Sequence, residues 1–159
     1  MAGSANAGAL TVLAARVLLA AAFLYAGSIK ALDPAAFALA IDNYRLLPYP
    51  LAAALALYLP WLEIACASGL FWPRLRLGAL AVLVALCFVF GAAITSAVLR
   101  DLDIGCGCFG GDGGSRASLL LSLLRSIALM FLAGWLLLRE MRAVERGRES
   151  TDRPGRGSV

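Results

Sequence analysis

Two cysteines separated by a single glycine, Cys106 and Cys108, are the residues of this chain best suited to covalent chemistry. They lie in a segment, residues 100–116, whose six glycines give the backbone access to conformations closed to other residues. A disulfide between cysteines so close in sequence closes a tight ring, and strain in that ring raises its reduction potential and makes it labile. A structural disulfide instead joins distant parts of a chain, where it removes more entropy from the unfolded state. The spacing favours a redox-active dithiol, with a structural turn as the alternative.

Metal binding competes for the same segment. The chain contains no histidine, and the segment offers two thiolates where a structural zinc site needs about four nitrogen or sulfur ligands. Asp101, Asp103 or Asp112 could complete only a poor site, and a soft ion such as Cu(I) is the metal that two thiolates suit best. We therefore predict no metal site. The other two cysteines, Cys66 and Cys87, fall inside apolar runs, where cysteine usually serves as a small hydrophobic side chain.

Three ionisable residues interrupt long apolar runs: Arg16, Glu63 and Arg125. Each would cost about 2.5–3.5 kcal/mol at the centre of a bilayer without a partner. Measured from the midpoints of the runs, Glu63 lies near the bilayer centre, with Arg16 and Arg125 each about 4 Å to either side of it. We therefore predict a buried network in which one carboxylate pairs with two guanidiniums. One alternative is that such a network serves only to align the helices. The other is that it forms a polar site for a quinone head group or a relayed proton.

The apolar runs define the elements that must position these residues. Hydrophobic residues make up 62% of the chain and charged residues 15%, and the mean hydropathy is +0.85, which excludes an ordinary soluble domain. Residues 77–99 contain no charge, and residues 9–29, 51–72 and 117–138 contain one each. Each run provides the roughly 20 residues that a membrane-spanning helix needs. The sequence predicts an all-α protein, an integral membrane four-helix bundle that occupies residues 1–140.

A short additional helix is predicted after the first span. Asp33 and Pro34 form a helix start, in which a capping carboxylate precedes a proline at the first helical position. Phe37, Ile41 and Tyr44 follow at helical spacing and share one face. We expect this helix to lie at the outer membrane interface with that face buried. It could cover a site beneath it or serve as a plain connector.

Basic residues are distributed unevenly between the two sides of the predicted bundle. Eight lie in the C-terminal tail and in the connection after the second span, and four lie on the opposite side, in residues 30–50 and 100–116. Because positive charge stays in the cytoplasm, we expect a plasma (bacterial inner) membrane protein with both termini cytoplasmic and with Cys106 and Cys108 in the periplasm. Residues 141–159 form a basic tail predicted to be disordered, whose charge suits anionic lipid heads rather than nucleic acid.

Several short motifs resemble one known family, the methylamine utilisation protein MauE family of DoxX-like integral membrane proteins. They occur in the family's order: YAGSIK at 25–30, DP at 33–34, YRLLP at 44–48, LPWLE at 59–63 and CGCFG at 106–110. The last of these is the most specific. The resemblance implies a four-helix membrane protein that is needed to mature a periplasmic enzyme. In the family's namesake pathway this enzyme is methylamine dehydrogenase, whose small subunit is rich in disulfides.

The resemblance also implies partners, namely a thioredoxin-like periplasmic protein and a disulfide-rich client enzyme. Cys106 and Cys108 would exchange disulfides with them, and electrons would pass to a quinone. The chain departs from membrane thiol oxidases that use two cysteine pairs, since it offers one plausible pair. We thus interpret it as a membrane factor of periplasmic thiol-disulfide chemistry, with a thiol-disulfide oxidoreductase role open. The alternatives are a non-catalytic membrane scaffold for the thioredoxin-like partner and a small quinone-binding or transport subunit centred on Glu63.

Overall fold

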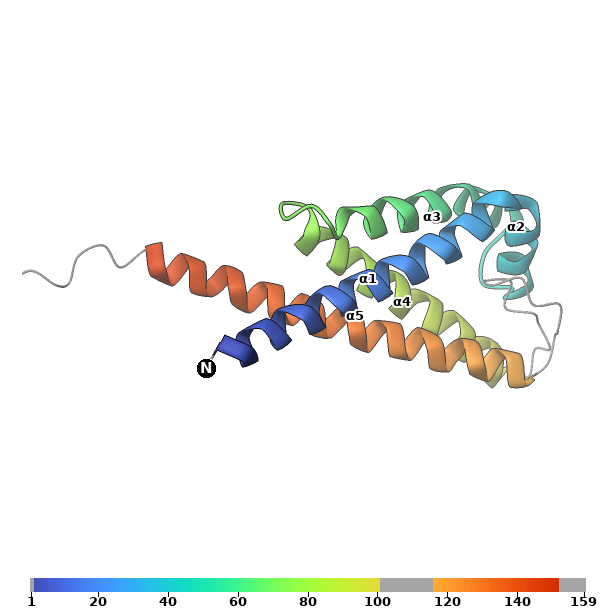
Figure 1. Cartoon of the computed structure of the whole chain (residues 1–159). Coiled ribbons are helices and arrows are strands. Elements are labelled where there is room, and N and C mark those ends of the chain that lie inside the picture. The colour runs from blue at the N-terminus through green and yellow to red at the C-terminus, as the bar shows by residue number, and fades with distance from the viewer. Residues whose placement is uncertain (1, 101–115, 152–159) are drawn as a thin grey trace, which may run out of the picture.

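A computed structural model describes the backbone of residues 2–100 and 116–151 and the side chains of residues 8–100 and 120–147. The described residues form five helices. The helices are α1 (Ala2–Leu32), α2 (Pro34–Asn43), α3 (Tyr49–Gly69), α4 (Arg76–Leu99) and α5 (Arg116–Thr151). Only helices and turns occur in these two stretches. The predicted all-α class is confirmed (Figure 1).

Four of the helices have the length and composition of membrane spans. The candidate spans are Gly8–Leu32, Tyr49–Gly69, Arg76–Leu99 and Leu120–Gly147, with mean hydropathies between 1.6 and 2.7. At most 33% of the most apolar window in any of them is buried inside the bundle. The described part of the chain leaves the remaining apolar surface uncovered, as is typical of helices that face hydrocarbon. The chain is a multi-pass membrane protein, as the apolar runs predicted.

The short helix α2 begins where the sequence predicts. The Asp33 side chain accepts a hydrogen bond from the backbone N–H of Ala36 at 2.9 Å, and Pro34 occupies the first turn. Phe37 is buried against α3, in a cluster that includes Ala56. The chain leaves the helix through Arg45, whose φ of 51° lies in the left-handed region. The α2 segment is therefore packed into the bundle, and it closes one end of it.

The bundle consists of two halves. Helix α1 packs mainly on α3, with α2 against α3 as well, while α4 packs mainly on α5. The largest apolar core joins the halves and includes the fully buried side chains of Leu19, Leu70, Leu83 and Leu136. This core includes Leu70 and Leu80, on either side of the α3–α4 turn, so it lies toward the end of the bundle that carries this turn and the N-terminus. We call this end the tail end (Figure 1). The opposite end, where α2, the end of α4 and the start of α5 lie, is the α2 end.

Helix α5 continues well past the predicted membrane domain. Residues 141–151, assigned from composition to a disordered tail, are helical and extend α5 beyond the bundle (Figure 1). Acidic and basic side chains are interspersed there, and an opposite-charge pair three residues apart, such as Arg142 and Glu145, supports a solvated helix. The predicted tail over 152–159 lies outside the described residues.

Candidate functional site

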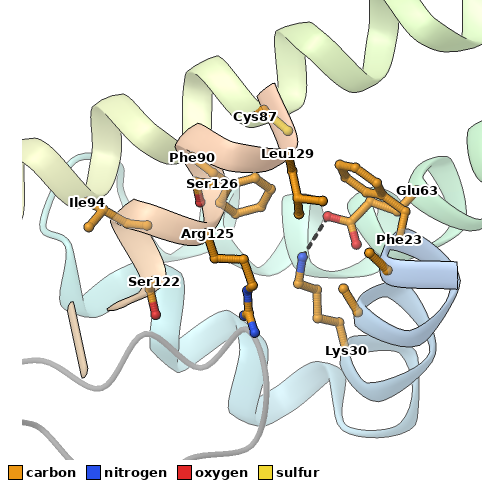
Figure 2. Close-up of a pocket in the computed structure, with 12 residues that line it drawn as sticks. Phe23, Lys30, Glu63, Cys87, Phe90, Ile94, Ser122, Arg125, Ser126 and Leu129 are labelled. Carbon is orange, nitrogen blue, oxygen red and sulfur yellow. Dashed lines mark hydrogen bonds and ion pairs between the residues drawn. The ribbon is translucent and has the colours of Figure 1, made fainter. Parts of the chain in front are cut away.

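A buried ion pair joins the first and third helices near the middle of the bundle. The ammonium of Lys30 on α1 donates a hydrogen bond to Oε1 of Glu63 on α3, at 2.6 Å. Their side chains are 3% and 1% exposed, so solvent does not screen the pair. Figure 2 shows the two side chains pointing toward one another. Two charges at this depth are tolerated because each supplies the other's counter-ion.

A glycine allows the two helices to bring these charges together. Gly27 lies one turn before Lys30 on α1, and a Cβ built there would be 2.9 Å from Cγ1 of Ile64 and 3.0 Å from the backbone oxygen of Pro60. Any side chain at this position would push α3 away. Close approach at Gly27 is therefore the local reason that Glu63 reaches Lys30.

Aromatic rings complete the surroundings of the Lys30 ammonium. Its nitrogen lies 4.5 Å from the ring centroid of Phe90 on α4 and 5.1 Å from that of Phe37 on α2. Both distances allow a cation–π interaction, which strengthens when the cation is removed from water. One lysine thus contacts side chains from α2, α3 and α4, and its contact with Phe90 joins the two halves of the bundle.

A cavity of about 50 Å³ lies beside the ion pair, between the two halves (Figure 2). Its polar lining consists of Lys30, Glu63, Cys87, Ser122, Arg125 and Ser126. The second carboxylate oxygen of Glu63, Oε2, is buried and accepts no hydrogen bond from the described part of the protein. A cavity of this size holds a few waters or the polar end of a larger molecule. The chemistry available is therefore hydrogen bonding to a buried acceptor, Oε2, on a carboxylate whose other oxygen is bonded to the Lys30 ammonium.

Two of the three charges predicted to meet do line this cavity. Glu63 and Arg125 are both part of its wall, although the guanidinium of Arg125 points away from the Glu63 carboxylate (Figure 2). Arg16 is elsewhere. The predicted carboxylate between two guanidiniums is therefore corrected, because the cation bonded to Glu63 is Lys30.

The correction has a geometric cause. The prediction assumes that the midpoints of the apolar runs lie at one depth. In the structure, α3 starts well beyond the end of α1, alongside α2, and meets α1 at Gly27. Glu63 consequently lies beside the last turns of α1 rather than its middle. Arg16 precedes Lys30 by 14 residues, which is about 21 Å along the helix. It is too far away to reach the carboxylate.

Arg16 has its own partner near the tail end. Its guanidinium donates to the carboxylate of Glu140 on α5, and Nη1 of Arg76, at the start of α4, lies 3.5 Å from the same carboxylate oxygen. All three side chains are 18–20% exposed. This cluster joins α1, α4 and α5, so it has a structural role in the bundle and lies apart from the cavity.

Removing the carboxylate of this cluster is expected to weaken the tail end. In Glu140→Gln, Arg16 and Arg76 lose their shared counter-ion, and we expect the free energy of unfolding to fall by about 1–2 kcal/mol, between the effects typical of exposed and of buried pairs. Unfolding in mixed micelles of increasing SDS fraction measures this change. Glu145→Gln, on the exposed part of the same helix, is the matched control. Equal effects of the two substitutions would contradict a structural role for Glu140.

The cysteines divide into two groups. Cys66 and Cys87 are free thiols on α3 and α4, the first half-buried and the second buried. Cys106 and Cys108, with Asp101, Asp103 and Asp112, lie outside the described residues. The segment that contains them connects the end of α4 at Arg100 to the start of α5 at Arg116, and both of these ends lie at the α2 end of the bundle (Figure 1).

Comparison with known proteins identifies the family. The family model of the methylamine utilisation protein MauE matches residues 8–139, which include all four candidate spans except the last turns of the fourth. The chain belongs to the MauE family. No solved structure matches it.

Three curated MauE proteins illustrate how similar the relatives are. Methylamine utilization protein MauE of Paracoccus denitrificans is 37% identical over 121 residues, covering 76% of this chain and 64% of that protein. The proteins of the same name from Methylophilus methylotrophus and Paracoccus versutus are 40% and 42% identical, over 56% and 60% of this chain. The matched regions correspond to between 47% and 64% of the lengths of these relatives.

Within this MauE-family chain, sequence reasoning missed Lys30. The apolar run ends at residue 29, so the sequence predicts that Lys30 belongs to the outward loop that follows it. A signal was nevertheless present, since Phe23, Gly27 and Lys30 recur at helical spacing and so share one face of α1. Phe90, the aromatic ring nearest the ammonium, carried no such signal, because a phenylalanine in an apolar run is ordinary.

Proposed function

We propose that this MauE-family protein is a membrane factor of periplasmic thiol-disulfide chemistry that assists the maturation of a disulfide-rich periplasmic enzyme in methylamine utilisation. The observation that carries the proposal is the pair Cys106 and Cys108, one glycine apart between two membrane spans. The names of the relatives, methylamine utilization protein MauE, support the choice of pathway. The proposed client is methylamine dehydrogenase, through its small subunit, and the proposed redox partner is a thioredoxin-like periplasmic protein.

The distribution of charge supports the orientation that the proposal needs. The tail end carries Arg74, Arg76 and the basic continuation of α5, and this end is proposed to face the cytoplasm. The connection between α4 and α5 would then face the periplasm of a bacterial inner membrane. That compartment is oxidising, so a dithiol there can cycle with its disulfide.

The proposed reaction is thiol-disulfide exchange. The thiolate of one cysteine attacks a sulfur of the partner's disulfide, which forms a mixed disulfide and releases the partner's second sulfur as a thiolate. The other cysteine, as a thiolate, then attacks the mixed disulfide. This step releases the reduced partner and leaves Cys106 and Cys108 joined as a disulfide, so two electrons have passed to the partner. In the reverse direction the same steps oxidise a partner dithiol.

Serine substitution tests this function. In cells that express the client, one of the two single variants, Cys106→Ser or Cys108→Ser, is expected to accumulate a mixed disulfide with the thioredoxin-like partner, because that variant keeps the attacking thiol and lacks the resolving thiol. Non-reducing electrophoresis and mass spectrometry detect it. The double variant Cys106→Ser/Cys108→Ser is expected to lower the client's disulfide content to that of a strain without this protein.

The control is Cys66→Ser, alone and combined with each single variant, which removes a thiol inside a span and is expected to leave the client's disulfides and the trapped mixed disulfide unchanged. If the client still acquires its disulfides with the double variant at Cys106 and Cys108, the thiol-exchange function is wrong. That outcome would instead favour a non-catalytic membrane scaffold.

A further inference from the structure

A groove between α4 and α5 opens on the outer surface of the bundle. Its volume is about 430 Å³, and most of its wall is apolar, including Phe88, Leu99, Leu123, Ile127 and Met130. Phe88 and Leu99 are 65% and 80% exposed, so the groove faces the surface that meets hydrocarbon. A volume of several hundred Å³ is typical of sites for small organic molecules.

Two polar side chains of α4 along this groove, Thr95 and Ser96, bond to their own helix. The hydroxyl of Thr95 donates to the backbone oxygen of Gly91 at 2.8 Å, and that of Ser96 donates to the backbone oxygen of Ala93 at 2.8 Å. Gly91 adds free space, since a Cβ built there would meet nothing within 4 Å. The groove is thus suited to an apolar chain or ring rather than to a polar head.

The groove adjoins the polar cavity. Cys87 and Ser126 belong to the walls of both, so they form the boundary between a hydrocarbon-facing hollow and the ion pair. Beyond this boundary, Oε1 of Glu63 is bonded to Lys30, while Oε2 is buried and accepts no hydrogen bond from the described residues. An unpaired buried acceptor is costly. A ligand hydroxyl that donates to Oε2 would remove that cost.

We propose that the groove and the cavity form one binding site for an isoprenoid quinone in its reduced, quinol form. The isoprenoid chain and the ring lie in the groove, and one ring hydroxyl passes Cys87 and Ser126 and donates to Oε2 of Glu63. The ammonium of Lys30, which lines the same cavity, provides a favourable field for the oxygen lone pairs of the head. This site is independent of Cys106 and Cys108 and does not rest on the thiol-exchange function.

The size of the cavity argues against a phospholipid head group inside it. A volume of about 50 Å³ holds a hydroxyl group and a few waters but not a phosphate with its ester groups. A flat ring that bears hydroxyl groups and an apolar chain matches both hollows, because the chain and ring suit the apolar groove and a hydroxyl suits the polar cavity.

Binding of decylubiquinol to the purified full chain in lipid nanodiscs tests the proposal. We expect saturable binding by the wild-type protein and by Gly78→Leu, and none by Gly91→Leu, whose side chain fills the groove. Both glycines lie on α4 and neither has an atom within 4 Å of a built Cβ, so the two substitutions are matched in their effect on the helix. Equal binding by the Gly91→Leu and Gly78→Leu variants, or no saturable binding by the wild type, would overturn the site.

The redox form and the head group are tested by competition. Decylubiquinone lacks the hydroxyl that donates to Oε2, so we expect it to bind about tenfold more weakly than the quinol, the effect of one hydrogen bond to a charged group. Decanol has a hydroxyl and a similar chain but no ring, and it is expected not to displace decylubiquinol at equal concentration. Equal affinity for quinone and quinol, or effective displacement by decanol, would reject a quinol site.

Discussion

Replacing Lys30 with methionine is expected to lower the free energy of unfolding by about 3–5 kcal/mol, because the Glu63 carboxylate then remains buried without its cation. Methionine keeps an unbranched chain of similar length, so the loss of packing is small. The two side chains are 3% and 1% exposed, and water therefore cannot replace the missing partner without opening the bundle. Unfolding of the purified protein in mixed micelles of increasing SDS fraction measures the change.

A double-mutant cycle identifies the cause of this loss. Glu63→Leu alone leaves the ammonium of Lys30 buried and is expected to destabilise the protein by a similar amount. The double variant Lys30→Met/Glu63→Leu removes both charges, and we expect it to recover most of the lost stability. Arg74→Met, at an exposed position, is the control for removal of a cation. If the double variant is no more stable than either single variant, the ion pair is not what makes Lys30 important.

Replacing Gly27 with leucine is expected to cost about 3 kcal/mol, the upper part of the range for overpacked interiors. The first atom of the new side chain would already lie 2.9 Å from Cγ1 of Ile64 and 3.0 Å from the backbone oxygen of Pro60. A backbone oxygen cannot rotate away as a side chain does, so α1 and α3 must separate. Separation also lengthens the contact between Lys30 and Glu63, and the two losses add.

The matched control for this substitution is Gly134→Leu on α5. A Cβ at Gly134 would meet nothing within 4 Å, so leucine there is expected to change the free energy of unfolding little. Gly27→Ala should give an intermediate loss, because alanine adds only the first atom of the clash. Loss of stability that is equal at Gly27 and Gly134 would show that the close approach of α1 and α3 is not required.

The number of spans and the start of α2 could be predicted because both depend on local properties. An apolar run such as 77–99 is long enough to cross hydrocarbon whatever it packs against. Asp33 caps α2 through the backbone N–H of Ala36, a residue three positions away, so the tertiary structure is not needed to recognise it. The continuation of α5 to Thr151 was missed, since composition alone does not separate a charged helix from a disordered tail.

The sequence by itself also identified Glu63 as a residue that needs a partner, because a carboxylate inside an apolar run is costly wherever the helix lies. Which cation supplies that partner was decided only by the tertiary structure. Helical spacing places residues along one helix, but the offset between α1 and α3 depends on where they touch, and they touch at Gly27. That contact brings Glu63 to Lys30 and leaves Arg16 to pair with Glu140. The depth of a residue in its own span is a local property, whereas the register between two spans is set by their packing.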